Sequence, residues 1–192
     1  MFTAVLDTCV LVPNYQRDFL LSMAVQNIYR PIWSEDILEE LRRVHIELAT
    51  TRRGRSADEA AREAEHLTGE MRSAFSDSTI RGCHRLDPCG LPDPDDEHVV
   101  AAAVLGGAGA IVTHNRKHFP RPALPENLLL RAPDRFAEDT AAADPEGAAT
   151  AIMEMSARTK NPPLSSTDVA DLLISRYGMH AAVDHARPYL PR

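Results

Sequence analysis

The sequence has few cysteines, few aromatic residues and no long apolar run. Its three cysteines, Cys9, Cys83 and Cys89, are too irregularly spaced for a disulfide framework, which favours a reducing compartment. No apolar run reaches about 18 residues, so nothing predicts a membrane span. The N-terminal residues lack a basic segment, and Asp7 interrupts their apolar stretch, which argues against a signal peptide. We therefore expect a cytoplasmic protein without membrane association.

Positive charge is also scarce, because 21 lysines and arginines face 28 acidic residues, giving a net charge of −7 over 192 residues. This balance excludes a generally basic surface for nucleic acid but not a local basic patch. Aromatic residues make up only 5% of the chain and are not interleaved with basic runs, so base stacking is not indicated. The sequence contains neither a P-loop nor a glycine-rich dinucleotide motif, which excludes the common nucleotide-binding loops.

Short apolar runs alternate with segments of helical periodicity over most of the chain. This alternation predicts an α/β fold, with a parallel sheet flanked by helices. The expected elements are strands over residues 3–6, 31–33, 79–86, 110–113 and 128–130, and helices over residues 15–28, 34–48, 57–76 and 93–105.

The character of the chain changes near residue 137. Residues 138–145 have the composition of a connector, and beyond them no further strand is expected. We predict two domains, an α/β domain over residues 1–137 and an all-helical extension over residues 138–192. The helices expected in the extension cover residues 146–159, 166–176 and 178–186.

Acidic residues gather where the predicted strands end. Asp7 follows the first strand, Glu40 lies in the helix after the second strand, and Asp93 and Asp96 begin the helix 93–105. Open parallel sheets bind ligands beyond the carboxyl ends of their strands. Glu40 alone could be solvated helix surface, and Asp93 and Asp96 could be helix caps. Asp7 requires a partner, because an unpaired acid at the end of a buried strand is costly to desolvate.

Carboxylates gathered in this way need a compensating charge. Two of them about 4 Å apart repel by about 4 kcal/mol at an effective dielectric constant of about 20. Mg²⁺ or Mn²⁺, which oxygen ligands bind well, would supply that charge.

Four sequence blocks follow one another along the chain: Val5–Leu11, Ser34–Leu41, Leu91–Val99 and Ile111–Pro120. In this order they resemble the PIN domain, and in particular PIN ribonucleases of the VapC toxin type that carry a helical extension. The resemblance covers about residues 1–137 through these blocks, and the rest by size and helical character. It implies a metal-dependent endoribonuclease, the toxin of a type II toxin–antitoxin system, with RNA as substrate and a small antitoxin as partner.

The resemblance also implies roles for individual residues. Asp7, Glu40 and Asp96 match acids of the family, and Asp93 belongs to the same Asp-Pro-x-Asp element as Asp96. Asp7 and Asp96 are expected to bind Mg²⁺ or Mn²⁺ directly, whereas Glu40 and Asp93 bind through water or orient the nucleophile. Asn115 stands where many members have a fourth acid. The amide removes one negative charge, so we expect one firmly held ion and a weakened second site.

Basic residues close to these blocks predict contacts with RNA phosphates. The segment Thr50–Arg55 is interpreted as a loop, and Arg116 and Lys117 follow Asn115 directly. His114 and His118 have the spacing of some zinc ligands, but no third ligand is evident, so they are interpreted as surface or supporting residues. The candidate phosphate-binding residues are Arg52, Arg53, Arg55, Arg116 and Lys117.

Two other functions stay open at this point. The amide at Asn115 is compatible with a non-catalytic PIN scaffold that binds RNA or protein, and the same acids would serve a nuclease that acts on DNA. The apolar faces of helices 15–28 and 166–186 could be core, an antitoxin surface or the interface of a homodimer.

Overall fold

The computed structural model describes residues 1–191, whose contacts form two compact units. The sheet unit contains Thr3–Val12 and Pro31–Leu130. The helical unit contains Met1–Phe2, Pro13–Arg30 and the chain from Arg131 onward. Among the described residues, no helix is both long enough and apolar enough to cross a membrane.

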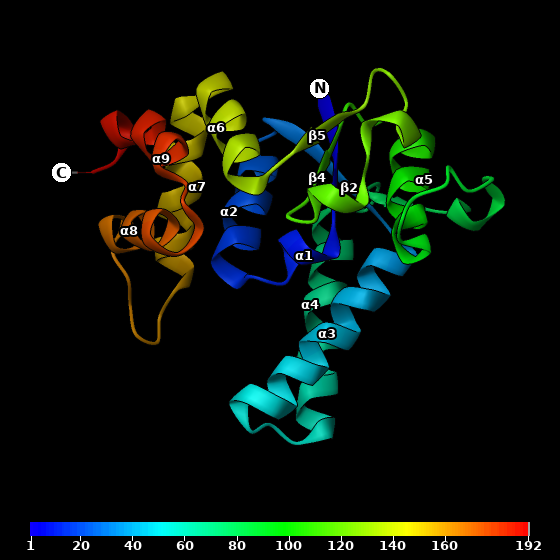
Figure 1. Cartoon of the computed structure of the whole chain (residues 1–192). Helices are drawn as coiled ribbons and strands as arrows, with labels where there is room; N and C mark the ends of the chain where they lie inside the picture. Colours follow the sequence, from blue (N-terminus) through cyan, green and yellow to red (C-terminus); the bar gives the residue numbers. More distant parts are fainter. Residues whose placement is uncertain (192) are drawn as a thin grey trace. The chain divides into compact units, whose positions relative to one another are not determined.

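A five-stranded parallel sheet, in the order β3-β2-β1-β4-β5, forms the centre of the sheet unit (Figure 1). The register of β1 on β4 pairs Val5 with Ile111, and that of β2 on β3 pairs Trp33 with Thr79. The neighbouring strands β1 and β4 are fully buried at their carboxyl ends, as their continuous apolar sequences predict. The predicted α/β fold is confirmed. The strands are β1 (Phe2–Leu6), β2 (Tyr29–Ser34), β3 (Thr79–Ile80), β4 (Ala110–Val112) and β5 (Leu129–Arg131).

The two long helices of the sheet unit begin at side chains that cap them. Ser34 ends β2 and its Oγ accepts a hydrogen bond from the Ile37 backbone N–H, which starts α3. Ser56 and Glu59 form a capping box at the start of α4. The two helices lie side by side as a hairpin (Figure 1). The α-helices of this unit are α1 (Thr8–Leu11), α3 (Glu35–Arg53), α4 (Ala57–Ala74) and α5 (Glu97–Gly106).

Two expectations about this unit were wrong. The strand expected over residues 79–86 ends at Ile80, because Gly82 has a φ of +81° and turns the chain into a 3-10 turn. The loop expected at Thr50–Arg55 is helical as far as Arg53, since α3 continues until Gly54 adopts a left-handed conformation. Short 3-10 turns at Cys83–Arg85, Pro94–Asp96, Arg116–His118 and Arg121–Ala123 complete the unit.

The helical unit has its own core. Helix α2 packs on α7, and α6 packs on α9. Tyr29 meets Phe136 edge to face with ring centroids 4.8 Å apart, and the Arg158 guanidinium donates to Ser22 Oγ at 2.6 Å. The three helices predicted for the extension are confirmed. The α-helices of this unit are α2 (Asn14–Val25), α6 (Pro133–Ala143), α7 (Pro145–Arg158), α8 (Ser166–Tyr177) and α9 (His180–Ala186).

The expected connector at residues 138–145 is another correction. Helix α6 runs through it to Ala143, because Phe136, Ala137 and Thr140 lie on a buried stripe of that helix. The break comes at Asp144, whose carboxylate accepts a hydrogen bond from the Gly147 N–H and so starts α7. The domain boundary at residue 137 stays a prediction, and the contacts additionally place α2 with the C-terminal helices.

Candidate metal centre

Asp7 is buried at the carboxyl end of β1, with only 3% of its surface exposed. Because β1 and β4 are parallel neighbours, their ends bring Asp7 and Thr113 together although 106 residues separate them. Thr113 Oγ1 donates to Asp7 Oδ2 at 2.5 Å, and Cys9 Sγ donates to the same oxygen at 3.1 Å. The partner that the sequence analysis required for Asp7 is therefore present.

Glu40 is positioned by the residue that follows Asp7. Thr8 Oγ1 donates to Glu40 Oε2 at 2.7 Å, which fixes α3 against α1. The Arg43 guanidinium lies 3.9 Å from the other oxygen of Glu40, but this arginine is largely exposed. Since an exposed pair of this kind contributes about 0–1 kcal/mol, Thr8 is the stronger constraint on Glu40.

Asp93 and Asp96 lie at the two ends of a single 3-10 turn before α5. Asp93 accepts a hydrogen bond from the Asp95 N–H at 3.1 Å, so it has the capping role considered for it. Asp96 makes no capping bond with its side chain. Instead, its Oδ2 lies 2.7 Å from Nδ1 of His118.

The Asp96 carboxyl is held in a negatively charged surrounding. Its pKa is raised chiefly by burial, and the charges of Asp7 and Asp93 raise it further. The hydrogen bond between His118 and Asp96 opposes this shift. Asp96 therefore combines partial burial with an excess of negative charge, which is an environment that a bound cation relieves.

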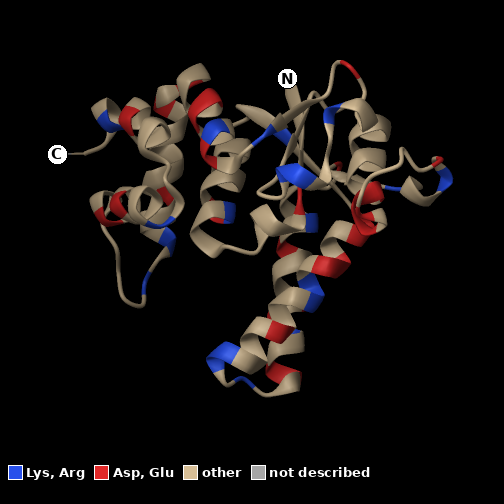
Figure 2. Cartoon of the chain, viewed as in Figure 1, with Lys and Arg blue, Asp and Glu red and all other residues tan. Residues whose placement is uncertain are grey.

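An open cavity of about 420 Å³ joins these groups. It brings together Glu40, Asp93, Asp96 and Asn115, four of the five predicted catalytic residues, while Asp7 acts on Asp96 through its charge. Figure 2 shows acidic residues gathered at the start of α5. The other residues lining the cavity are Asp36, Glu39, Arg43, Asp95, His98 and His118.

The family model of the PIN domain matches residues 3–117, more than half of the chain. The chain belongs to the PIN-domain family. A second family model, the VapC50 C-terminal domain, matches residues 133–188. The PIN resemblance found in the sequence is thereby confirmed, together with its extension of VapC type.

One curated relative comes from Mycobacterium tuberculosis (strain ATCC 25618 / H37Rv) and is named "Putative ribonuclease VapC50". It is 36% identical over 88 residues, which is 45% of this chain. The match spans 52% of that relative, about half of its length. No solved structure matches the chain.

Two histidines of the PIN cavity had been given no role in it from the sequence. His98 faces the cavity from α5, and its Nδ1 lies 3.2 Å from Ser34 Oγ. The spacing of His118 from His114 suggests a pair of metal ligands on its own, but the structure directs the His118 ring toward Asp96 and Asp93. The only sequence signal for His118 is that it lies three residues after Asn115, and nothing in the sequence places it beside Asp96.

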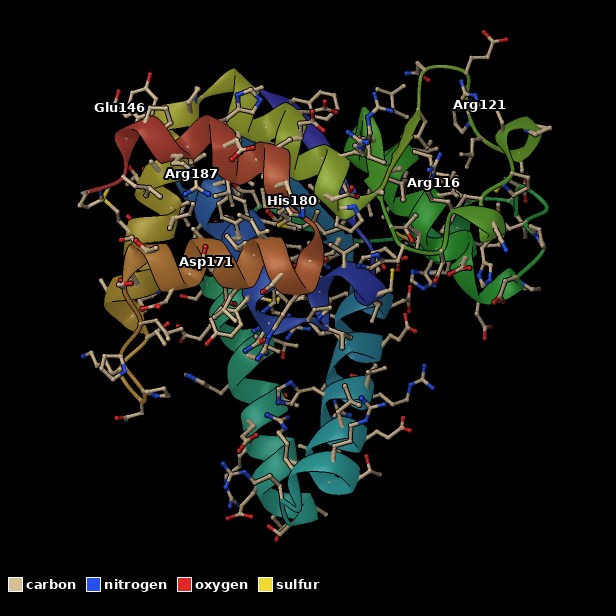
Figure 3. The ribbon with its side chains drawn as sticks, turned by 60° about the vertical axis from the view of Figure 1, so that its left-hand side comes forward. Arg116, Arg121, Glu146, Asp171, His180 and Arg187 are labelled. Atoms are coloured by element: carbon tan, nitrogen blue, oxygen red, sulfur yellow. The ribbon has the colours of Figure 1, made fainter. Side chains whose placement is uncertain are left out.

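The predicted phosphate-binding residues separate into two groups. Arg116 and Lys117 belong to the same 3-10 turn as His118, beside the PIN cavity (Figure 3 labels Arg116). The far end of the α3–α4 hairpin carries the other group, Arg52, Arg53 and Arg55, and Figure 2 shows basic residues there. At about 1.5 Å per residue, Arg52 lies about 18 Å along the helix from Glu40. Arg53 and Arg55 also pair with Glu63, at 3.6 and 3.1 Å.

The donor atoms present fit a divalent cation. One atom each from Asp93, Asp96 and His118 lie within 4.8 Å of one another. Carboxylate oxygens suit Mg²⁺ and Mn²⁺ alike, whereas an imidazole nitrogen suits Mn²⁺ and other transition ions better. With Asp7 and Glu40 close by, this part of the PIN domain has the ligand types that a hydrolytic metal centre needs.

Proposed function

We propose that this PIN-domain protein is an Mg²⁺- or Mn²⁺-dependent endoribonuclease, the toxin of a type II toxin–antitoxin system. The observation that carries the proposal is the cavity in which Asp93, Asp96 and His118 converge next to the buried Asp7. Membership of the PIN family and the name of the mycobacterial relative support the same reaction class. The proposed reaction is hydrolysis of RNA phosphodiester bonds.

Asp7 and Asp96 are the proposed direct ligands of the ion. Thr113 and Cys9 both donate to Oδ2 of Asp7, so Oδ1 is the oxygen that receives neither bond and is available to a cation. The hydrogen bond from Thr8 orients Glu40 in the same way. These bonds are formed before any ligand arrives, so the carboxylates need little rearrangement to bind it.

Glu40, Asp93 and Asn115 complete the proposed catalytic set. A divalent ion in this cavity would activate a water molecule and offset negative charge on the scissile phosphate. Glu40 and Asp93 bind the ion through water or hold the attacking water by accepting its proton in a hydrogen bond. Asn115 offers a neutral amide oxygen, which weakens a second cation site beside the first.

The RNA substrate is proposed to approach over Arg116 and Lys117, whose turn borders the cavity. The two cationic side chains would pair with RNA phosphates and so reduce the repulsion between the RNA and the negatively charged protein. Arg52, Arg53 and Arg55 would meet only an RNA that extends along the hairpin. We propose the remaining partner to be an antitoxin protein that presents a cationic side chain to the acids.

The domain organisation and the oligomeric state are part of the same proposal. Residues 1–137 are proposed to be the nuclease domain and residues 138–192 its helical extension. A homodimer is an additional proposal, to be tested by the mass of the protein in solution. All the proposed catalytic residues lie in the sheet unit, so the proposed chemistry requires neither the helical extension nor a second copy of the chain.

The experiment that tests the function is cleavage of total RNA by the purified protein with Mn²⁺, with Mg²⁺ and with EDTA. Each reaction is paired with one on Asp7→Asn. Metal-dependent cleavage that the variant lacks is expected. Absence of cleavage by a folded protein free of antitoxin would favour the non-catalytic scaffold. Preferential cleavage of a matched DNA oligomer would favour the DNA nuclease.

A further inference from the structure

His118 stands between two carboxylates of the cavity. Its Nδ1 lies 2.7 Å from Asp96 Oδ2 and 3.6 Å from Asp93 Oδ2. The His118 side chain is 42% exposed, whereas that of Asp96 is 17% exposed. The imidazole therefore lies on the outer side of the carboxylate, where it meets both Asp96 and whatever Asp96 binds.

Hydrogen bonds link the position of His118 to the first acid of the site. The backbone N–H of His118 donates to the Asn115 carbonyl at 2.9 Å, and the backbone N–H of Asn115 donates to Thr113 Oγ1 at 2.9 Å. Thr113 in turn donates to Asp7. The next residue, Phe119, is buried with 2% exposure and anchors the end of the turn in the core. The backbone that carries the imidazole is thus fixed relative to Asp7.

A contact between exposed side chains would not need a backbone that hydrogen bonds and a buried Phe119 hold in place. An exposed pair of histidine and carboxylate contributes little to stability. His118, however, directs a ring nitrogen at two carboxylates that are both proposed to serve the ion. A neutral imidazole nitrogen is a common ligand for transition metals and a poor one for Mg²⁺.

We propose that His118 is itself a ligand, through Nδ1, of the ion bound directly by Asp96 and through water by Asp93, and that it makes this site select Mn²⁺ over Mg²⁺. Nδ1 binds in its deprotonated form, with the ring proton on Nε2, so the ion replaces the hydrogen bond between His118 and Asp96. The inference rests on the proposed function, which it deepens by naming the preferred ion. Nitrogen from His118 replaces one of the oxygen donors that a purely acidic site would offer. The remaining ligands are still carboxylates, so Mg²⁺ binds as well but gains nothing from the imidazole.

The test is pulsed electron paramagnetic resonance of Mn²⁺ bound to the full-length protein, freed of other metals. Nitrogen coupling to the manganese is expected in the wild type and is expected to be lost in His118→Gln. The matched control is His66→Gln, since His66 is exposed on α4 and does not line the cavity. This control should keep the coupling unchanged.

Calorimetry on the same proteins gives a second measurement. His118→Gln is expected to raise the Kd for Mn²⁺ by about 10-fold and that for Mg²⁺ by less than about twofold. Equal weakening of both ions would overturn the proposal, because a residue that only supports the fold or orients Asp96 would affect both.

The wild-type spectrum tests for a nitrogen ligand even if the His118→Gln variant does not fold. Manganese that binds without nitrogen coupling, or a coupling that is unchanged in folded His118→Gln and therefore comes from another nitrogen such as that of His98, excludes His118 as the ligand. If RNA cleavage continues in either case, only the role of His118 is refuted. If Mn²⁺ does not bind and no metal supports cleavage, the proposed function fails with it.

Discussion

The hydroxyl of Thr113 donates a 2.5 Å hydrogen bond to the carboxylate of Asp7, across the junction of β1 and β4. Both residues are buried, with 3% of Asp7 and 0% of Thr113 exposed. The bond directs one oxygen of Asp7 inwards, which leaves the orientation of the carboxylate fixed. Thr113 is thus a positioning residue for the first acid of the site.

Replacing Thr113 tests this relationship. Thr113→Val keeps the shape of the side chain but removes the donor, so it should lower the free energy of unfolding by about 1–3 kcal/mol. Metal affinity should fall as well, because Asp7 loses its fixed orientation. Thr113→Ser retains the hydroxyl and should restore metal affinity. Urea unfolding and calorimetry measure the two effects, and a valine variant that binds metal like the wild type would contradict the positioning role.

Asp96→Asn should separate metal binding from stability. The wild-type carboxylate is opposed by the charges of Asp7 and Asp93, so its neutralisation should leave the metal-free protein at least as stable. In the wild type, a metal at 100 times its Kd should add about 2.7 kcal/mol to the free energy of unfolding. The variant should lose this gain, and its RNA cleavage should fall by about 100-fold or more.

Thermal unfolding with and without Mn²⁺ measures the gain in stability. Asp58→Asn is the matched control, because Asp58 is an exposed acid in the first turn of α4. It should respond to Mn²⁺ like the wild type. A metal-induced stabilisation that survives in Asp96→Asn would remove Asp96 from the set of ligands.

Glu97 closes the loop that leads to the acidic turn. Its carboxylate accepts hydrogen bonds from the N–H groups of Cys89, Gly90 and Leu91, at 2.7 to 2.9 Å. Burial opposes ionisation of Glu97, but the hydrogen bond from the Cys89 thiol and these backbone hydrogen bonds together lower its pKa below the ordinary value of 4.5. A depressed pKa in the folded state means stability that is present above pH 4.5 and lost as the pH falls through the folded value.

We therefore expect the loop at Gly90 to loosen in acid. The amide signals of Gly90 and Leu91 in NMR spectra should shift as the pH falls below about 4.5, with a midpoint under that value. In Glu97→Gln the same signals should show no such transition. A midpoint above pH 4.5 in the wild type would contradict the assigned direction.

Two neighbouring glycines at the end of α5 should respond differently to alanine. A Cβ at Gly106 would lie 2.3 Å from Ile32 Cδ1, so Gly106→Ala should destabilise by about 1–3 kcal/mol, although alanine favours helices. Gly107 has open space around it but a φ of +63°, and Gly107→Ala should cost about 1–2 kcal/mol through backbone strain alone.

Ile32→Val distinguishes the two causes. It removes the atom that a Cβ at Gly106 would meet, so it should recover part of the stability lost in Gly106→Ala and none of that lost in Gly107→Ala. Urea unfolding of the single and double variants measures this coupling. Equal recovery in both backgrounds would contradict the steric explanation for Gly106.

The sequence by itself determined the alternation of strands and helices, because apolar runs and helical stripes are local patterns. It also determined that Asp7 ends a buried strand and that Ser34 begins a helix, since both depend on adjacent residues. The end of α3 was predicted too early, since its exposed last turn continues until Gly54 adopts a left-handed conformation. Helix α6 was not predicted, because buried contacts sustain a helix through residues whose composition alone indicates a connector.

Only the tertiary structure decided which side chains share the cavity. The parallel pairing of β1 with β4 brings Thr113 to Asp7, and the turn after β4 brings His118 to Asp96. The same fold sends Arg52 to the far end of a hairpin, away from Glu40. These are contacts between residues distant in the chain, and they depend on strand order and helix length, for which sequence spacing carries no direct signal.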